Sequence, residues 1–455
     1  MKKTKKKLVI STVAYLLITV TLLLPVFMIG IQSTNEYARE ITQQPETQMT
    51  THETRNVTFE ESGFTPILGL SQEDFLYDFD FLIRTLEENF PSFGIIYRRN
   101  GVDMLKLATE LRESFFGKDV EWDYLGFYDM LRSEFFRHAW PVGHLRLVSY
   151  SALREDFPSL YFNTRTRTGR IYNHLSHQLR GTIWREENIS VAREDRGFTN
   201  NRIITNIPID GYVAYIRLPH MDNLTVAHPV RIDIVDNFFS EIEEFGHLII
   251  DLRGHTGGWI DPFKELLVTP FIDEPLETTF HHFYMQGHEN TRYMLTIPGR
   301  FDRVPIYDLD LEEIFGHSVL SEAVIEDLQR MDMYMPRTAV VQPNLDRRVS
   351  FDPKIWLLTD INNFSAAQHI AAFFYQTGFA TLVGDTTGGM AVYMCSFPSH
   401  HFTLPNTGFM VRYDPLYIIS ACGRPWEYGT VPHHFNREGM DALQTVLAII
   451  AEGNY

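Results

Sequence analysis

Residues 247–258 read His-Leu-Ile-Ile-Asp-Leu-Arg-Gly-His-Thr-Gly-Gly, an apolar run followed at once by a glycine-rich turn. A short apolar run that ends in such a turn is typical of a strand buried on both faces of a sheet. A second apolar run, Ile355–Thr359, precedes a helical pattern at Ala366–Gln376. Apolar strands that alternate with helices predict a mostly parallel sheet with both faces covered, so we expect an α/β core.

The neighbouring segments extend this pattern. Tyr212–Leu218 has the composition of a strand, Val230–Glu244 that of a helix, and Gly439–Ala451 carries apolar residues at helical spacing. We therefore assign residues 206–455 to the core. Residues 145–205 carry short, mixed signals, which we interpret as small strands and loops.

Residues 70–144 are predicted to form a helical subdomain. After Ser71, apolar side chains recur on one helical stripe, and Pro91 ends the pattern. Further helices are expected near Leu105–Phe115 and Tyr124–Phe136. The stripe of the first helix consists of Phe75, Phe79, Leu82 and Leu86.

The first 33 residues predict a membrane anchor. Lysines crowd residues 1–7, and the apolar run Leu8–Ile31 that follows spans about 36 Å as a helix, enough for a hydrocarbon core of about 30 Å. The positive-inside rule leaves the lysines in the cytoplasm and exports the body as a single-pass protein of the cell membrane. The polar residues 34–69 then form a linker. A signal peptide, whose cleavage gives a secreted protein, is the alternative.

The composition argues against several functional classes. The 455 residues carry 58 acidic and 40 basic side chains, a net charge of −18. An acidic surface repels phosphate backbones, so no nucleic acid is expected as a partner. Two cysteines, Cys395 and Cys422, are too few for a disulfide framework or a thiolate zinc site. In an exported body they form either one disulfide or two separate thiols, and the sequence leaves both open.

Ser365 is the candidate nucleophile. It lies between a predicted strand and a predicted helix, where a turn presents Oγ to a cleft and the helix N–H groups favour a developing anion. The alternative is that Ser365 and Gln368 form a capping box, which needs no chemistry. His369 lies four residues after Ser365, and a local pair of that kind more often packs than catalyses.

A candidate base and a candidate anion-binding turn accompany the serine. His144 lies where the helical unit gives way to a strand, and a neutral imidazole is the usual partner of a hydroxyl nucleophile. The glycines of residues 253–258 let backbone N–H groups approach a substrate, although an ordinary tight turn is the alternative. Adjacent histidines on a strand point to opposite faces, so neither a metal nor another cofactor is expected at His281–His282, His400–His401 or His433–His434.

Together these segments resemble peptidase family S41, the C-terminal processing and tricorn-like serine peptidases. The resemblance covers residues 70–455, with about 150–205 unmatched, and rests on several segments in the family's order. They are Gly143-His-Leu-Arg-Leu147, Gly211-Tyr-Val-Ala-Tyr-Ile-Arg-Leu218, Asp251-Leu-Arg-Gly-His-Thr-Gly-Gly258, Asn363-Phe-Ser-Ala-Ala-Gln368, Val383-Gly-Asp-Thr-Thr-Gly-Gly389, Glu427-Tyr-Gly-Thr-Val-Pro432 and Gly439-Met-Asp441.

The resemblance implies a crotonase- or ClpP-like α/β core that hydrolyses peptide bonds in peptide or protein substrates. It implies Ser365 as the nucleophile and His144 as its base, with Glu427 supporting the imidazole. Backbone N–H groups of Ala366, Gly257 and Gly258 would then hold the oxyanion.

Several departures from the family pattern matter for function. Met390 stands where the processing-type members carry their catalytic lysine, which favours the tricorn-like arrangement with a histidine base. Gly143 stands where other members often carry a hydroxyl residue that connects the glutamate to the histidine by hydrogen bonds. His255 stands in place of an Asn in the glycine turn, and His433 in place of the Asp that follows the proline of the last motif. Two further hypotheses therefore remain: a catalytically inactive protein that binds a peptide or an apolar ligand, and a metal-dependent hydrolase.

Overall fold

The structure is a computed structural model, and it describes residues 69–116, 122–149, 203–218, 229–258, 260–296, 302–316, 320–389 and 400–453. The chain divides into two compact units, Met1–Thr65 and Pro66–Tyr455, and the described residues all belong to the second. The expected anchor and all but the last residue of the expected linker lie outside the described residues. Within those ranges, no helix is both long and apolar enough to cross a bilayer.

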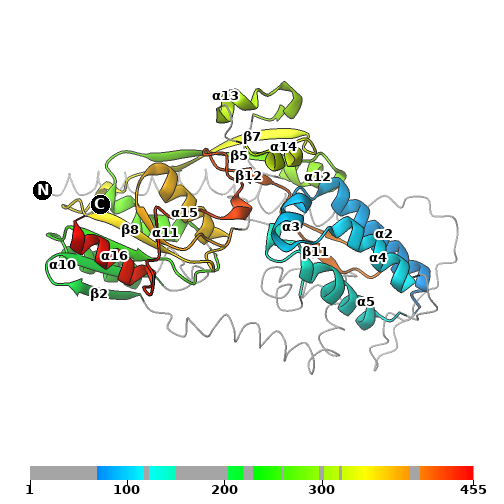
Figure 1. Cartoon of the computed structure of the whole chain (residues 1–455), viewed down its shortest axis with the longest axis horizontal. Coiled ribbons are helices and arrows are strands. Elements are labelled where there is room, and N and C mark those ends of the chain that lie inside the picture. Colours follow the sequence, from blue (N-terminus) through cyan, green and yellow to red (C-terminus); the bar gives the residue numbers. More distant parts are fainter. Residues whose placement is uncertain are drawn as a thin grey trace, which may run out of the picture. The chain divides into compact units, whose positions relative to one another are not determined.

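A six-stranded sheet carries the α/β core (Figure 1). Its strand order is β13-β9-β8-β4-β3-β2, in which the five strands from β13 to β3 run parallel and β2 pairs antiparallel at the edge. The prediction of a mostly parallel sheet is therefore confirmed. The strands are β2 (Ile204–Ile209), β3 (Val213–Arg217), β4 (His247–Asp251), β8 (Lys354–Thr359), β9 (Thr381–Gly384) and β13 (His434–Phe435).

Helices cover both faces of this sheet. On β4, Leu248 and Ile250 face a core completed by α10, α11 and α15, whereas Ile249 faces a second layer formed with α16 (Figure 1). Successive strand residues point to opposite faces, so a strand covered on both sides must be apolar at every position. This explains the unbroken apolar runs of the sequence. The helices are α10 (Pro229–Glu241), α11 (Ile260–Leu267), α15 (Ala366–Thr377) and α16 (Ala442–Glu452).

Two smaller antiparallel sheets accompany the central one. The first has the order β12-β5-β7-β6, and the second has the order β1-β11-β10. Their strands are β1 (Arg146–Leu147), β5 (Leu276–Tyr284), β6 (Val304–Pro305), β7 (Met333–Val341), β10 (His401–Thr403), β11 (Met410–Arg412) and β12 (Tyr417–Ile419), and the helices near them are α12 (His288–Thr296), α13 (Leu311–Phe315) and α14 (Glu322–Leu328).

The first helices follow the sequence expectation with two differences. α2 (Gln72–Asn89) begins at a capping box formed by Ser71 and Asp74 and ends before Pro91. α4 (Met104–Phe116) and α5 (Tyr124–Met130) are the other expected helices, but α5 gives way to a π-helical turn at Leu131–Phe135. α3 (Phe93–Asn100) was not expected, because eight residues are too few for a clear periodic pattern.

These helices share one hydrophobic core with the β10–β11 hairpin. The Phe127 ring of α5 stacks on the Phe409 ring of the hairpin, with centroids 6.2 Å apart. The buried carboxylate of Asp78 on α2 accepts hydrogen bonds from Asn406 N at 2.8 Å and from Thr407 N and Oγ1 at 2.6 Å. Residues more than 250 positions away therefore complete the core of the helical region.

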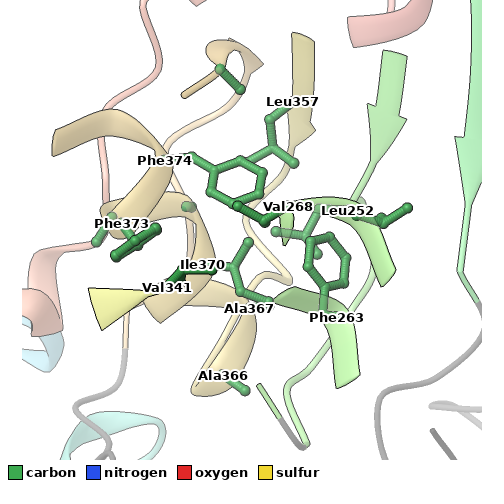
Figure 2. Packing of buried hydrophobic residues seen from close by; sticks show 14 of the residues in the cluster. Leu252, Phe263, Val268, Val341, Leu357, Ala366, Ala367, Ile370, Phe373 and Phe374 are labelled. Carbon is green, nitrogen blue, oxygen red and sulfur yellow. The ribbon is translucent and has the colours of Figure 1, made fainter. Parts of the chain in front are cut away.

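The central core sets the first testable expectation. Leu357 on β8 is fully buried among the residues of Figure 2, whereas Leu345 is 71% exposed. Leu357→Ala leaves a cavity beneath α15 and is expected to lower the free energy of unfolding by about 2–5 kcal/mol. Leu345→Ala, the same chemical change at the surface, is expected to stay within about 0.5 kcal/mol. Chemical denaturation of both variants checks this, and equal losses would contradict the assignment of β8 to the core.

Candidate active site

Ser365 occupies a strained corner between β8 and α15. Its backbone has φ 57° and ψ −120°, and among the described residues His144 is the other non-glycine residue with a positive φ. Such a conformation costs of order 1–3 kcal/mol, so surrounding contacts must hold it in place. Ser365 N–H donates to the carbonyl oxygen of Gly389 at 3.2 Å, and Ser365 O accepts from His369 N at 3.0 Å. A strained strand-to-helix turn of this kind projects a serine Oγ from the end of a sheet.

The capping-box alternative for Ser365 is wrong. The Ser365 side chain makes no capping hydrogen bond at the start of α15. Gln368 instead turns to another segment, where its Nε2 donates to Thr430 Oγ1 at 3.1 Å and its Oε1 accepts from Thr430 N at 3.2 Å. The Ser365 hydroxyl is therefore not used to stabilise the helix that follows it.

The predicted glycine turn lies directly against the serine. A Cβ atom built on Gly257, whose φ is 122°, would stand 2.7 Å from Ser365 Cβ and 3.0 Å from its Oγ. Only a residue without a side chain permits so close an approach. The backbone of this turn is therefore placed beside the hydroxyl, as expected from the sequence.

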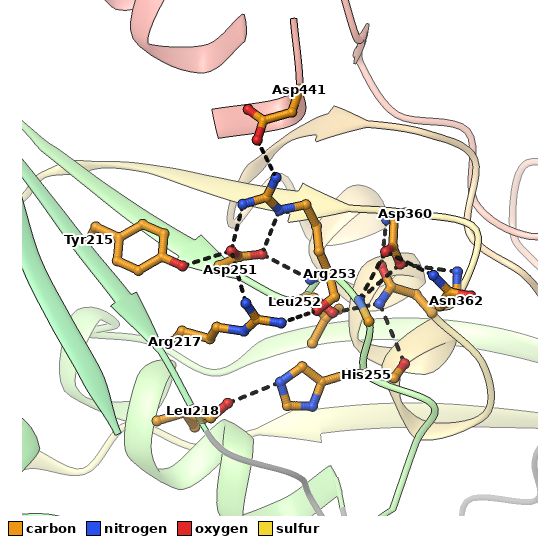
Figure 3. Close-up of polar contacts among 12 residues, drawn as sticks. Tyr215, Arg217, Leu218, Asp251, Leu252, Arg253, His255, Asp360, Asn362 and Asp441 are labelled. Atoms are coloured by element: carbon orange, nitrogen blue, oxygen red, sulfur yellow. Dashed lines mark hydrogen bonds and ion pairs between the residues drawn. The ribbon is translucent and has the colours of Figure 1, made fainter. Parts of the chain in front are cut away.

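Hydrogen bonds between two loops hold Ser365 and the glycine turn in this arrangement (Figure 3). Gly254 N donates to both carboxylate oxygens of Asp360 at 3.0 Å, and Asn363 Nδ2 donates to Leu252 O at 2.5 Å. Asp360 and Asn363 belong to the loop that ends at Ser365, whereas Leu252 and Gly254 belong to the glycine turn. The relative position of nucleophile and turn is thus fixed by side chains as well as by the sheet.

An ionic network around the buried Asp251 anchors the start of the glycine turn. Asp251 accepts hydrogen bonds from Tyr215 OH at 2.7 Å and from Arg253 Nη2 at 2.9 Å, and Arg253 also reaches Asp441 at 3.1 Å (Figure 3). These contacts lower the pKa of Asp251 although burial opposes them. His255 Nε2 contacts Leu218 O at 3.0 Å, so this residue, which departs from the family pattern, is directed to backbone.

His144 lies at the end of the helical region, in a left-handed turn with φ 46°. Its Nδ1 is 2.5 Å from Asp414 Oδ2, and the two side chains are 11% and 9% exposed. A carboxylate at Nδ1 accepts the imidazole proton there, which leaves Nε2 as the acceptor nitrogen. Burial lowers the pKa of His144, the Asp414 charge opposes that shift, and Arg412 and Arg146 add to it. A neutral imidazole suits the role of a base.

Glu427 lies beside the base loop but contacts its backbone. The carboxylate is buried, and Oε1 accepts a hydrogen bond from Gly143 N at 3.2 Å. The sequence led us to expect Glu427 at the imidazole, and the structure instead places Asp414 there. Asp414 has no local sequence signal, because it follows β11, 270 residues after the histidine.

A chain of contacts links the serine to the base loop. Ser365 N–H bonds to Gly389 O, and a Cβ built on Gly389 would meet the carbonyl oxygen of Glu427 at 2.4 Å. Glu427 in turn bonds to Gly143, the neighbour of His144. In parallel, the Trp140 ring lies 6.3 Å from the ring of Phe364, the residue before the serine. These contacts connect the segments that carry the candidate nucleophile, base and acid.

The remaining histidine candidates are packed in the structure. His369 is fully buried against Phe280 and Trp426. His281 bonds to Tyr334 OH at 2.9 Å. Within the described ranges, no three His, Cys, Asp or Glu side chains gather where a metal ion could be held. Met390 and Cys395 lie outside those ranges, and Cys422 is exposed.

Comparison with solved structures places the fold. A peptidase from Parabacteroides merdae, whose structure is described as that of a putative peptidase, aligns with 84% of this chain and 97% of its own at 16% identity, with a TM-score of 0.50. At this identity the likeness shows the fold alone. A CPAF mutant aligns at 12% identity over 80% of this chain and 93% of its own (TM-score 0.48), and a putative S41 protease from Bacteroides fragilis at 15% over 56% and 58% (TM-score 0.32).

The match to a family model identifies the class of this protein as a serine-type peptidase. Residues 212–433 match the model of peptidase family S41, a segment that contains Ser365, the glycine turn and Glu427. This match, which covers just under half of the chain, confirms the resemblance to peptidase family S41 seen in the sequence. His144 lies upstream of the matched residues.

Gly257 provides a test of the site geometry. Gly257→Ala drives a methyl group into Ser365, and a misplacement of about 1 Å at a reacting group costs on the order of 10²-fold in rate. We expect a loss of that size in the rate at which a serine-reactive phosphonate labels the protein. Gly439, also left-handed at φ 74°, has open space around it, so Gly439→Ala is the matched control and should label almost normally. Equal rates for the two variants would show that the turn does not touch the nucleophile.

Proposed function

We propose that this protein is a membrane-anchored, extracytoplasmic serine peptidase in which His144 activates Ser365. The single observation that supports it best is the strained Ser365 corner packed against Gly257, with its hydroxyl not used for helix capping. Backbone strain at a polar residue is kept where function requires that geometry. The match to the model of peptidase family S41 supports the reaction class.

The proposed reaction proceeds in two stages. His144 Nε2 takes the proton of Ser365 as Oγ forms a bond to the peptide carbonyl carbon. The imidazolium then gives this proton to the leaving amine as the C–N bond breaks. In the second stage His144 takes a proton from water as the water oxygen bonds to the acyl carbon, and it gives this proton to Ser365 Oγ as the ester C–O bond breaks, which releases the carboxylic acid product and restores the serine.

Backbone groups supply the oxyanion site in this proposal. Ala366 is the first residue of α15, and the first N–H groups of a helix have no partner within it. Together with the N–H groups of Gly257 and Gly258, it would stabilise the tetrahedral intermediate, and each such donor is worth roughly 10²–10³ in rate. Glu427 holds the base loop through its hydrogen bond with Gly143 N.

Labelling with a fluorophosphonate probe tests the reaction. Attack by Ser365 Oγ forms an O–P bond and expels fluoride, while the hydroxyl proton passes to His144. We expect stoichiometric labelling of the full-length protein, complete loss in Ser365→Ala, and a loss of at least about 10³-fold in His144→Ala. Intact-protein mass spectrometry measures the adduct.

The alternatives give different outcomes in the same experiment. Folded protein that is never labelled would favour the inactive, ligand-binding hypothesis suggested by Met390. Peptide hydrolysis that survives Ser365→Ala but is abolished by a chelator would favour the metal-dependent hydrolase. Either result would overturn the serine peptidase proposal.

The membrane anchor rests on the lysine cluster and the apolar run at Leu8–Ile31. We expect the labelled protein to sediment with membranes, to resist extraction by high salt and to dissolve in detergent, because a mostly apolar run of 24 residues is long enough to span the bilayer. Removal of residues 1–33 should release it. Appearance of the labelled protein in the medium, with its first residue downstream of Ile31, would instead establish the secreted form.

A further inference from the structure

Two buried carboxylates approach the loop that carries the proposed base, and they do so differently. Asp414 contacts the His144 imidazole at 2.5 Å, whereas Glu427 bonds to the backbone N–H of Gly143 at 3.2 Å. We propose that Asp414 is the positioning residue of the base, holding the imidazole so that Nε2 is aimed to take the Ser365 proton. This inference rests on the proposed function.

The ends of two paired strands bring His144 and Asp414 together. β1 begins two residues after His144, and β11 ends two residues before Asp414. In the β1–β11 ladder, Arg146 lies opposite Arg412. Beyond the ladder, Asp414 N donates to Gly143 O at 2.7 Å, so the two segments stay hydrogen-bonded next to the left-handed turn of His144.

The backbone at residue 143 limits what Glu427 can do. Gly143 has φ 59°, and a Cβ there would lie 2.6 Å from the Phe90 ring. Residue 143 therefore has no room for a side chain that could pass a hydrogen bond from Glu427 to the imidazole. The hydrogen bond that Glu427 Oε1 accepts comes from the backbone of Gly143, whereas the carboxylate in contact with His144 Nδ1 is that of Asp414.

The charges around His144 require such a partner. The charged groups that act on the imidazole are Asp414, Arg412 and Arg146, of which the two arginines disfavour the imidazolium. Burial disfavours it further. The carboxylate of Asp414 is the group that opposes both effects, so it stabilises the cation that forms when Ser365 loses its proton.

Substitution of the two carboxylates separates their roles. Asp414→Asn keeps the shape but removes the charge and permits the wrong imidazole tautomer, so we expect the limiting phosphonate-labelling rate to fall about 10³–10⁴-fold with little change in the half-saturating probe concentration. Because the Asp414 charge raises the pKa of His144, its loss should also move the acid limb of the rate profile to lower pH. Glu427→Gln should leave the midpoint of that limb in place.

Asp78→Asn is the matched control. Asp78 is a buried aspartate that accepts hydrogen bonds from Asn406 and Thr407 of the β10–β11 hairpin. This variant is expected to lower the thermal midpoint without moving the acid limb. If Asp414→Asn also lowers the thermal midpoint, the control separates the two effects. Loss of stability alone does not shift the acid limb of the rate profile, whereas loss of the Asp414 charge does.

Titration of His144 by NMR in Ser365→Ala protein tests the pair without any activity. We expect a downfield Nδ1–H resonance and a His144 pKa that falls when Asp414→Asn is added. If Glu427→Gln produces that fall and Asp414→Asn does not, the proposal is overturned while the peptidase function stands. If the unsubstituted protein is never labelled, the proposed function fails, and the titration still decides which carboxylate is coupled to His144.

Discussion

The strained backbone of Ser365 is the constraint on which the rest of the site depends. A positive φ at a residue with a side chain costs of order 1–3 kcal/mol and persists only where the surroundings enforce it. Here the preceding strand β8 is central in a parallel sheet, and the following helix α15 is buried along most of its length. The hydrogen bond from Ser365 N–H to Gly389 O holds the backbone of Ser365 from a third segment. The corner is therefore held by elements that are themselves among the most buried of the core.

The proposed base depends on a different hydrophobic core. His144 follows the helical region, whose core is shared with the β10–β11 hairpin, and the next residues after β11 supply Asp414. Asp78 fastens that hairpin to α2 through three hydrogen bonds. Contacts from α3 then tie this region to the nucleophile: Arg99 Nη1 donates to Gly388 O at 3.0 Å, and it also bonds to Glu427 O. Through these contacts the packing of the helices determines where the imidazole stands.

The sequence reveals those parts of this arrangement that depend on local patterns. Continuous apolar runs at β4 and β8 predict the parallel sheet, because strands with two covered faces are apolar at every position. The location of Ser365 after such a strand predicts its corner, and the adjacent glycines predict the close turn. The capping-box alternative shows the limit of this reasoning, since S-x-x-Q describes a local bond that the strained φ of Ser365 does not allow. Asp414 has no local signature, because its contact with His144 joins two segments that lie 270 residues apart in the sequence.

Gly143 explains why two carboxylates occur at one base. Its left-handed φ lets the chain turn from the helical region into β1, and the Phe90 ring fills the space where a side chain would begin. Phe90 belongs to the core of the helices, so the packing that orders the base loop also excludes a side chain at residue 143 that could link Glu427 to His144. Glu427 bonds to the backbone of the loop, and Asp414, which follows β11, contacts the imidazole. The division of labour between the two acids follows from the packing of one aromatic ring against a glycine.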